Sequence, residues 1–387
     1  MIQRSTGTYV ESSLAGSRYR AFVPAPLPPT PPLDLSQPDM IARKERADQA
    51  LGRLDGITLL LPDPALFLYQ YVRKEALLSS QIEGTQSSLS DLLLFELDEA
   101  PGVPLDDVEE VSNYVAALNH GLRRVREDGF PLSLRLLREM HELLLRGGRG
   151  AHKTPGEFRR SQNWIGGRSP ATAAFVPAPP DHLPQCLGEL DRFLHDDSVP
   201  AVIRAALAHV QFETIHPFLD GNGRLGRLLI ALMLCSDGVL REPTLYLSLY
   251  FKTHRARYYS LLDAVRTEGD WEGWLAFFLD GIAETAQQAV DAAQRLLQLL
   301  NADRSRINAL GRRAGNVGQV FEQFAQRVVL TVPQATPRLP FSAPTIRAAI
   351  DSLMELGIVN ELTGQRRNRV FAYQRYLEIL SEGAQPL

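Results

Sequence analysis

The chain has 387 residues, of which 44% are hydrophobic and 22% charged, and its net charge is -4. This is the composition of a globular protein with a sizeable buried core, and it excludes a general attraction to nucleic acid or to an anionic membrane. The charge is uneven, because the stretch from Asn301 onward carries 11 arginines against 7 acidic residues. The C-terminal part is therefore basic while the rest of the chain is acidic.

Cysteine usage and hydropathy predict a cytoplasmic protein. Cys186 and Cys235 stand apart in apolar surroundings, which argues against a disulfide framework or a paired-cysteine metal site. The stretch from Met1 to Phe22 lacks the continuous apolar core of a signal peptide. The longest apolar run, Leu228–Cys235, is far shorter than the ~20 residues of a membrane span. We therefore expect no membrane partner.

The first part of the chain predicts an extended segment followed by helices. Pro24–Pro32 is proline-dense and must be extended. We interpret it as a strap across the protein's own surface, with an SH3-like partner as the alternative. Apolar residues at helical spacing then predict helices over Ile41–Leu54, Leu66–Leu78, Leu105–Arg126 and Ser133–Leu145. Pro131 and Ser133 together are a typical signal for the start of the last of these helices.

The middle of the chain predicts a hairpin and more helices. Two short extended runs surround a turn-prone Arg-Ser-Pro sequence within Gln162–Val176, which is typical of a β-hairpin. The stretch from Pro184 to Ile307 looks helical throughout, apart from the region around His216.

The C-terminal part has the element order of a winged helix-turn-helix. Val317–Leu330 predicts a helix, and a second one begins with Ser342 and Pro344 and ends at Gly357. Ile358–Leu362 and Val370–Tyr373 then predict two strands around a basic turn.

The most informative segment is His216–Arg227, which reads His-Pro-Phe-Leu-Asp-Gly-Asn-Gly-Arg-Leu-Gly-Arg. A helix ends at the proline, and another starts near Arg224. The glycines allow close approach of a ligand to the backbone, and a helix N-terminus behind them favours an anion. Arg224 and Arg227 are three residues apart and can lean over the same side of that helix.

Two further residues of this segment suggest the chemistry. Asp220 offers one carboxylate for Mg²⁺ shared with phosphates, and His216 is a base at neutral pH. The combination indicates phosphoryl or nucleotidyl transfer. The alternative is a glycine-rich loop with a core histidine and two solvated arginines. That interpretation would be the better one for a lone histidine, but not for a histidine that occurs together with the glycines, the aspartate and the two arginines.

This segment matches the Fic pattern His-Pro-Phe-x-Asp/Glu-Gly-Asn-Gly-Arg-x-x-Arg at all nine fixed positions, and the chain therefore resembles the Fic family. The resemblance implies a protein adenylyltransferase that moves AMP from ATP to a hydroxyl side chain and releases pyrophosphate, with Mg²⁺ as cofactor. It implies that His216 takes the hydroxyl proton, that Phe218 anchors the loop and that Asp220 holds the metal. The ATP-binding residues it implies are Leu219, Asp220, Gly221, Asn222, Gly223, Arg224 and Arg227.

The resemblance extends to the flap and to the adenine pocket. The hairpin, with Asn163, Trp164, Ile165 and Gly166, resembles the flap that pairs with an extended segment of the target protein; the alternative is a purely structural hairpin. The sequence from Arg257 to Leu262 resembles the adenine-side helix, with Tyr259 and Leu262 as base-contacting residues; the alternative is that both belong to the core.

The resemblance also includes an inhibitory segment. Ser79-Ser80-Gln81-Ile82-Glu83-Gly84 fits the pattern Ser/Thr-x-x-x-Glu-Gly/Asn. The resemblance assigns an inhibitory role to Ser79, Glu83 and Gly84, and it implies that Glu83 pairs with Arg227. Without the Fic motif, this pattern would indicate only a surface helix.

The C-terminal part resembles the winged-helix domain that is appended to many bacterial Fic proteins. Arg347, Arg366, Arg367 and Arg369 could contact the phosphates of DNA; a protein-interaction or dimerisation module is the alternative, and a homodimer is left open. We expect a mainly α fold, with a Fic-type helical core, a β-hairpin flap and a small winged helix-turn-helix domain. The expected domains are an N-terminal segment with strap and inhibitory helix (1–104), a catalytic core (105–285), a helical linker (286–310) and the winged helix (311–387).

Two other functions remain open from the sequence. One is another Fic-type reaction, with a different nucleotide, with transfer of phosphate, or with removal of AMP. The other is a DNA-binding regulator that keeps a nucleotide-sensing core.

Overall fold

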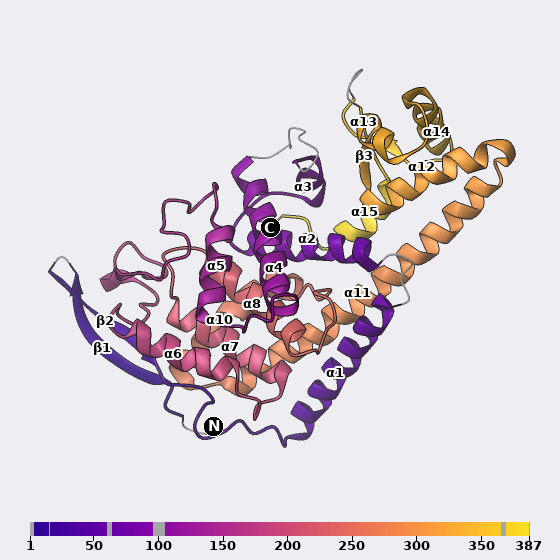
Figure 1. The fold of residues 1–387 in the computed structure, drawn as a ribbon. Helices are drawn as coiled ribbons and strands as arrows, with labels where there is room; N and C mark the ends of the chain where they lie inside the picture. The colour runs from indigo at the N-terminus through magenta and orange to yellow at the C-terminus, as the bar shows by residue number, and fades with distance from the viewer. Residues whose placement is uncertain (1–3, 15, 60–63, 96–104, 365–368, 387) are drawn as a thin grey trace.

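The computed structural model describes residues 4–14, 16–59, 64–95, 105–364 and 369–386. The chain is mainly helical, as predicted, and it contains two small sheets (Figure 1). The long helix α11 (Trp271–Asn308) connects the helical body to a C-terminal module (Figure 1). In the described part of the chain, no helix is long and apolar enough to cross a bilayer.

The N-terminus forms an antiparallel hairpin that the sequence analysis missed. Strand β1 (Gly7–Leu14) pairs with β2 (Ser17–Pro24), with Gly7 opposite Pro24. The clearest sequence signal is in β2, where buried Tyr19 and Ala21 alternate with exposed Arg18 and Arg20. Strand β1 gives no such signal, because all of its residues are exposed or half-buried.

The proline-dense segment follows the hairpin and has no regular secondary structure, in agreement with the strap interpretation. Buried Arg4 donates to the carbonyl oxygens of Pro31 and Pro32 at 2.8 and 3.0 Å and pairs with Glu272 at the start of α11. The strap is therefore held against the protein's own surface.

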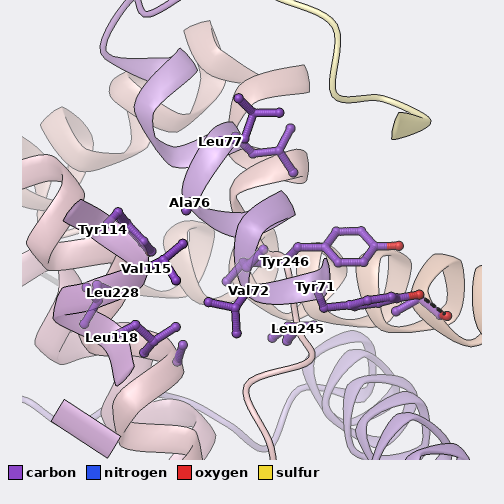
Figure 2. Close-up of a cluster of buried hydrophobic side chains, with 14 of the residues drawn as sticks. Tyr71, Val72, Ala76, Leu77, Tyr114, Val115, Leu118, Leu228, Leu245 and Tyr246 are labelled. Atoms are coloured by element: carbon purple, nitrogen blue, oxygen red, sulfur yellow. Dashed lines mark hydrogen bonds between the residues drawn. The ribbon is translucent and has the colours of Figure 1, made fainter. Parts of the chain in front are cut away.

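Three helices follow the strap: α1 (Pro38–Thr58), α2 (Pro64–Ile82) and α3 (Leu89–Phe95). Helix α1 packs along α11. Figure 2 shows how α2 is fixed in the core. Its side chains Tyr71, Val72, Ala76 and Leu77 are buried in one cluster with Tyr114, Val115, Leu118, Leu228, Leu245 and Tyr246.

Five helices build the centre of the body: α4 (Leu105–Arg126), α5 (Leu134–Leu144), α6 (Leu183–Leu194), α7 (Ala201–Ile215) and α8 (Asn222–Ser236). Helix α4 has its predicted bounds, and Ser133 caps α5 by accepting from the Leu136 N–H. Helices α7 and α8 are buried over almost their whole length and pack against each other. They position the loop between them inside the protein.

The structure differs from two predictions for the middle of the chain, the continuous helical stretch and the hairpin. Residues 237–247 are not helical, because Gly238 takes a φ of 70° and Pro243 cannot donate a helical hydrogen bond. Helices α9 (Ser248–Thr253) and α10 (Arg255–Glu268) follow. The predicted hairpin is a loop closed by a single antiparallel bridge between Ile165 and Phe175, with a short 3-10 turn, η1 (Pro170–Thr172), inside it.

The C-terminal module begins after α11 with η2 (Gly311–Arg313), α12 (Ala314–Arg327), β3 (Val329–Thr331), α13 (Val332–Ala335) and η3 (Thr336–Arg338). It continues with α14 (Ala343–Glu355), β4 (Asn360–Glu361), β5 (Val370–Ala372) and α15 (Gln374–Ser381). The antiparallel sheet has the order β3-β5-β4.

The sequence analysis extended the first helix of this module too far. It ends at Arg327, since Val328 has a φ of 64°, and the β-branched residues that follow form a strand instead. Gly357 ends α14 with a φ of 65°, as predicted. Arg366 and Arg367 lie outside the described residues.

Candidate active site

The site is built on the loop between α7 and α8. His216 follows the last residue of α7 in the left-handed conformation, with φ 50° and ψ 59°, and its N–H donates to the carbonyl of Phe212. This conformation is uncommon for a residue other than glycine and is often found at functional sites. It turns the chain away from the helix axis at the histidine.

The loop is locked by hydrogen bonds within itself. The Asn222 side chain accepts from the Phe218 N–H and donates to the Phe218 carbonyl, both at 2.9 Å. Phe218 is fully buried, as its anchoring role requires, and its ring stacks on His141 with 3.7 Å between centroids.

His141, on α5, is a residue that the sequence analysis missed. Its Nδ1 accepts from the Gly156 N–H, so the proton lies on Nε2, which donates to the carbonyl of Asp220 at 3.0 Å. Burial lowers the pKa of His141 to about 4, so the ring is neutral at pH 7 and keeps this tautomer. A single histidine on an amphipathic helix carries no sequence signal for such a role.

Arg159 and Asn163 hold the loop from the other side. Buried Arg159 donates to the carbonyl oxygens of His216 and Ala178 at 2.9 and 2.5 Å. Asn163, which the sequence assigned to target docking, donates to the carbonyl oxygens of His216 and Phe218 at 3.3 and 2.9 Å. Both residues therefore position the catalytic loop.

His216 is arranged as a proton acceptor. Its Nδ1 lies 3.3 Å from the carbonyl oxygen of Glu213, which can only accept, so Nδ1 carries the proton and Nε2 is the basic nitrogen. Burial lowers the pKa of His216 to about 4. The imidazole is therefore neutral at physiological pH and can take a proton without first losing one.

Arg224 is fully buried at the start of α8 and lies beside Glu110 of α4, another residue that the sequence analysis missed. The NH1–Oε1 distance is 3.1 Å, and both side chains are no more than 2% exposed. Within the described residues, Nε and NH1 of Arg224 have no hydrogen-bond partner of normal geometry. An anionic ligand could accept hydrogen bonds from these two buried nitrogen atoms and so satisfy them.

Arg227 is held by the last turn of α2 and by Glu83, which directly follows that helix. Its Nε and NH2 donate to the hydroxyl and the carbonyl of Ser79, each at 2.9 Å, and NH2 pairs with Glu83 Oε1 at 2.7 Å. The contact expected between Glu83 and Arg227 is therefore present. Burial would raise the pKa of Glu83, but the Arg227 guanidinium outweighs it and holds the pKa below its usual value.

The Glu83 carboxylate also covers the first turn of α8. A Cβ placed on Gly223 would lie 2.3 Å from Glu83 Oε1, so only glycine permits this approach. Gly84, with a φ of 102°, ends the turn that carries the carboxylate. The negative group thus occupies the helix N-terminus that an anionic ligand would use.

Asp220 is suited to share a cation with such a ligand. Its side chain is 35% exposed, and Oδ1 accepts from the Gly221 N–H at 2.7 Å. In the described ranges, no group of three or more His, Cys, Asp and Glu side chains forms a metal site of its own. Mg²⁺ commonly takes one or two carboxylates and completes its shell with phosphates and water, so one carboxylate fits it.

The remaining predicted residues lie around this centre in different environments. Tyr259 is 42% exposed, whereas Leu262 is buried in the core. Leu219 is half-buried in the loop. The backbone N–H and C=O of Ile165 are both used inside the flap, in bonds with Phe175 and Ala174, so Ile165 itself offers no free backbone group to a partner.

The helical body thus brings a neutral histidine, a helix N-terminus and two buried arginines together, and this combination is suited to a phosphate-containing ligand. Residues 131–234 match the Fic/DOC family model, and residues 41–123 match the model of the Fic/DOC family N-terminal region. The chain is 31% identical over 249 residues to Protein adenylyltransferase Fic of Aedes aegypti, which covers 62% of this chain and 46% of that protein. It is 29% identical over 213 residues to the protein of the same name from Drosophila virilis, with 52% and 38% covered.

The fold agrees with these matches. A Fic family protein from Desulfovibrio desulfuricans has a similar structure, with a TM-score of 0.57 over 87% of this chain and 96% of that chain at 19% identity. Residues 41–234 thus contain a Fic/DOC domain and the N-terminal region of that family, and the chain is distantly related to proteins named as adenylyltransferases. Its matches span less than half the length of these two curated relatives.

Proposed function

We propose that the protein is an adenylyltransferase that transfers AMP from ATP to Ser, Thr or Tyr hydroxyls of a target protein, and of itself, with release of pyrophosphate. One observation carries the proposal: a neutral histidine with a basic Nε2 stands on the same loop as a helix N-terminus with two buried arginines. The kinship to proteins named as adenylyltransferases supports the choice of AMP.

In the proposed reaction, the target hydroxyl oxygen attacks the α-phosphorus of ATP. The hydroxyl proton passes to Nε2 of His216, and the bond from the α-phosphorus to the bridging oxygen breaks, so that pyrophosphate leaves. Arg224 and Arg227 bind the β- and γ-phosphates and orient them for in-line attack. Mg²⁺ bound at Asp220 would neutralise charge on the departing phosphates.

The same proposal includes autoinhibition by Glu83. The carboxylate holds Arg227 and lies against Gly223, so it occupies both the guanidinium and the helix N-terminus that the γ-phosphate needs. ATP could still bind, but with its α-phosphate away from the line of attack. A misplacement of ~1 Å can lower a rate by ~10²-fold.

The test compares purified wild type and Glu83→Gly, incubated with Mg²⁺ and ATP labelled in the α-phosphate. We expect much greater incorporation into Glu83→Gly, and the label should be lost when His216→Ala is added. Parallel reactions with GTP, CTP, UTP and γ-labelled ATP distinguish transfer of another nucleotide or of phosphate, and an AMP-modified substrate tests removal. Equal incorporation by folded wild type and Glu83→Gly contradicts the autoinhibition.

A second proposal concerns the C-terminal module. Its order of helix, strand, two helices and two strands, with sheet order β3-β5-β4, supports a winged helix-turn-helix. Arg347 of α14 and Arg369 line one cavity of about 210 Å³ in this module. Two cations at one recess are suited to a phosphate of duplex DNA.

Binding of this module to DNA is tested with labelled genomic fragments at several salt concentrations. Arg347→Ala should weaken binding and reduce its salt dependence. Arg53→Ala, at an exposed position of α1, should leave the affinity and its salt dependence unchanged. Absence of binding at low salt favours the alternative of a protein-interaction module.

A further inference from the structure

The segment after α15 returns from the C-terminal module to the end of α2. Figure 1 shows the end of the chain, marked C, beside α2. Ala384 accepts from Gln81 in the last turn of α2, which also carries Ser79 and leads directly into Glu83. Its neighbours Gly383 and Gln385 accept from Lys252 of α9, which itself donates to Gln81. Two distant parts of the sequence thus meet at the turn that presents the inhibitory carboxylate.

Gln81 is the centre of this contact. Its fully buried amide nitrogen donates to the carbonyl oxygens of Ser87 and Ala384, each at 2.9 Å. Its amide oxygen accepts from Lys252 Nζ at 2.7 Å. Both amide hydrogens and the oxygen therefore have partners, and Ala384 supplies one of them. Removing the segment would leave a buried donor unsatisfied.

Lys252 of α9 joins the segment to Gln81. Its ammonium donates to the carbonyl oxygens of Gly383, at 3.4 Å, and of Gln385. Among the described residues, it has no carboxylate in ion-pair contact, so neutral carbonyl groups alone satisfy a cation that is only 6% exposed. Burial lowers the pKa of Lys252, as expected for such a group. Water can replace these carbonyl groups as partners of the ammonium, so the contact between Lys252 and residues 383–385 can break and form again.

The segment is attached to the C-terminal module and to α11 by further contacts. Glu382 makes a bidentate ion pair with Arg295 of α11, with both distances at 2.7 Å. The Tyr373 hydroxyl, just before α15, donates to buried Asp303 of α11 at 2.6 Å. These contacts attach α15 and Glu382 to α11, so a displacement of the module must break them before it reaches residues 383–385.

We propose that residues 383–385 are a clamp that keeps the last turn of α2 in its inhibitory position. Glu83 is only two residues from Gln81, and its N–H donates to Ser80 within the same turn. When the clamp is displaced, this turn loosens and the Glu83 carboxylate leaves Arg227 and Gly223. The proposal rests on the proposed autoinhibition, and it connects the C-terminal module to the active site.

Two full-length variants break the clamp from different sides. In Gly383→Val, a β-branched residue would have to adopt a φ of 75°, and its Cβ would lie 2.8 Å from Leu249 Cδ1, so the substitution strains the backbone of the segment against α9. Gly129→Val is its matched control, because φ is 61° there and no described heavy atom lies within 4 Å of the added Cβ. Lys252→Met removes the ammonium with little change in volume, and Lys44→Met does the same on α1 at a side chain that is 40% exposed.

Two measurements are made on each variant: incorporation of α-labelled ATP into the protein itself, and hydrogen exchange of residues 79–87. We expect Gly383→Val and Lys252→Met to raise incorporation by roughly fivefold to tenfold, the factor that one net hydrogen bond represents. Exchange of residues 79–87 should rise in both, and the two controls should match the wild type. Added to Glu83→Gly, neither change should increase incorporation further.

The possible results separate the two proposals. If Glu83→Gly is activated but both clamp variants stay at the wild-type rate, the clamp is wrong and the autoinhibition stands. If Glu83→Gly itself stays at the wild-type rate, the autoinhibition is wrong, and the clamp loses its regulatory role with it. Should Gly383→Val fail to fold, as judged by its circular dichroism, Lys252→Met gives the same comparison because it adds no bulk.

Discussion

The catalytic loop and the last turn of α2 are held in different ways. The loop is fixed by the buried, uncharged side chains of His141 and Asn222 and by Arg159, which bond to carbonyl and N–H groups of the loop. The turn is fixed by Arg227, which ATP also needs in the proposed mechanism, and by residues 383–385. One region is preorganised for catalysis, and the other is attached through contacts that a ligand or a moving module can exchange.

The largest expected effect breaks the catalytic side of this comparison. His216→Ala, made in the Glu83→Gly background so that activity is measurable, should lower incorporation from labelled ATP by at least ~10²-fold, because the general base is lost. ATP binding, measured by calorimetry, should persist because the helix N-terminus and both arginines remain. Undiminished transfer would contradict the proposed mechanism.

The next change removes the residue that both regions share. Arg227→Ala frees the end of α2 but also removes the γ-phosphate contact, so transfer should stay at least roughly tenfold below that of Glu83→Gly. The same labelling assay measures it, with Glu83→Gly as the reference. Transfer equal to that of Glu83→Gly would show that Arg227 serves only to hold the inhibitory turn.

A smaller effect is expected at Glu110, which positions Arg224. Glu110→Gln removes the charge that faces the buried guanidinium at 3.1 Å, and transfer in the Glu83→Gly background should fall by roughly tenfold, mainly through a higher KM for ATP. Glu109→Gln is the matched control, since it makes the same change one residue earlier on α4. An unchanged KM for Glu110→Gln would mean that Arg224 is positioned by α8 alone.

The smallest expected effect is a pH profile that stays flat. A histidine with its usual pKa would lose basicity as the pH falls through about 6.5. The pKa of His216 is lowered to about 4, so the neutral base is already present above that value. The kcat of Glu83→Gly should therefore change little from pH 8 to about 5.5 and decline only at lower pH. A midpoint near 6.5 would indicate a solvated histidine.

Parts of this arrangement could be predicted from the sequence because their determinants are local. The segment from His216 to Arg227 contains its own helix end, glycines and cations, and Ser79 and Glu83 lie one helical turn apart. Helix bounds were predicted best where the apolar periodicity was clear, as in α4, or where a capping residue marks the start, as at Ser133.

The remaining features depend on contacts between distant parts of the chain. Glu110, His141 and Arg159 each act through a single side chain that packing brings to the loop, and no spacing marks them. The strand after Arg327 was missed because the apolar residues there fit either a helix or a strand. Gln81 and residues 383–385 are about 300 positions apart in the sequence, and only the fold brings them together.

The length of α11 limits how the C-terminal module can move. With 38 residues and no proline, this helix is a rod about 57 Å long. Sharp kinks in helices arise at proline, at inserted turns or where side chains break the hydrogen-bond ladder. A pivot between the module and the rod therefore falls at the short connection after Asn308, where Gly311 adopts a φ of 63°. A swing about that point has to break the contacts of Tyr373 with Asp303 and of Glu382 with Arg295 before it can separate α15 from α2.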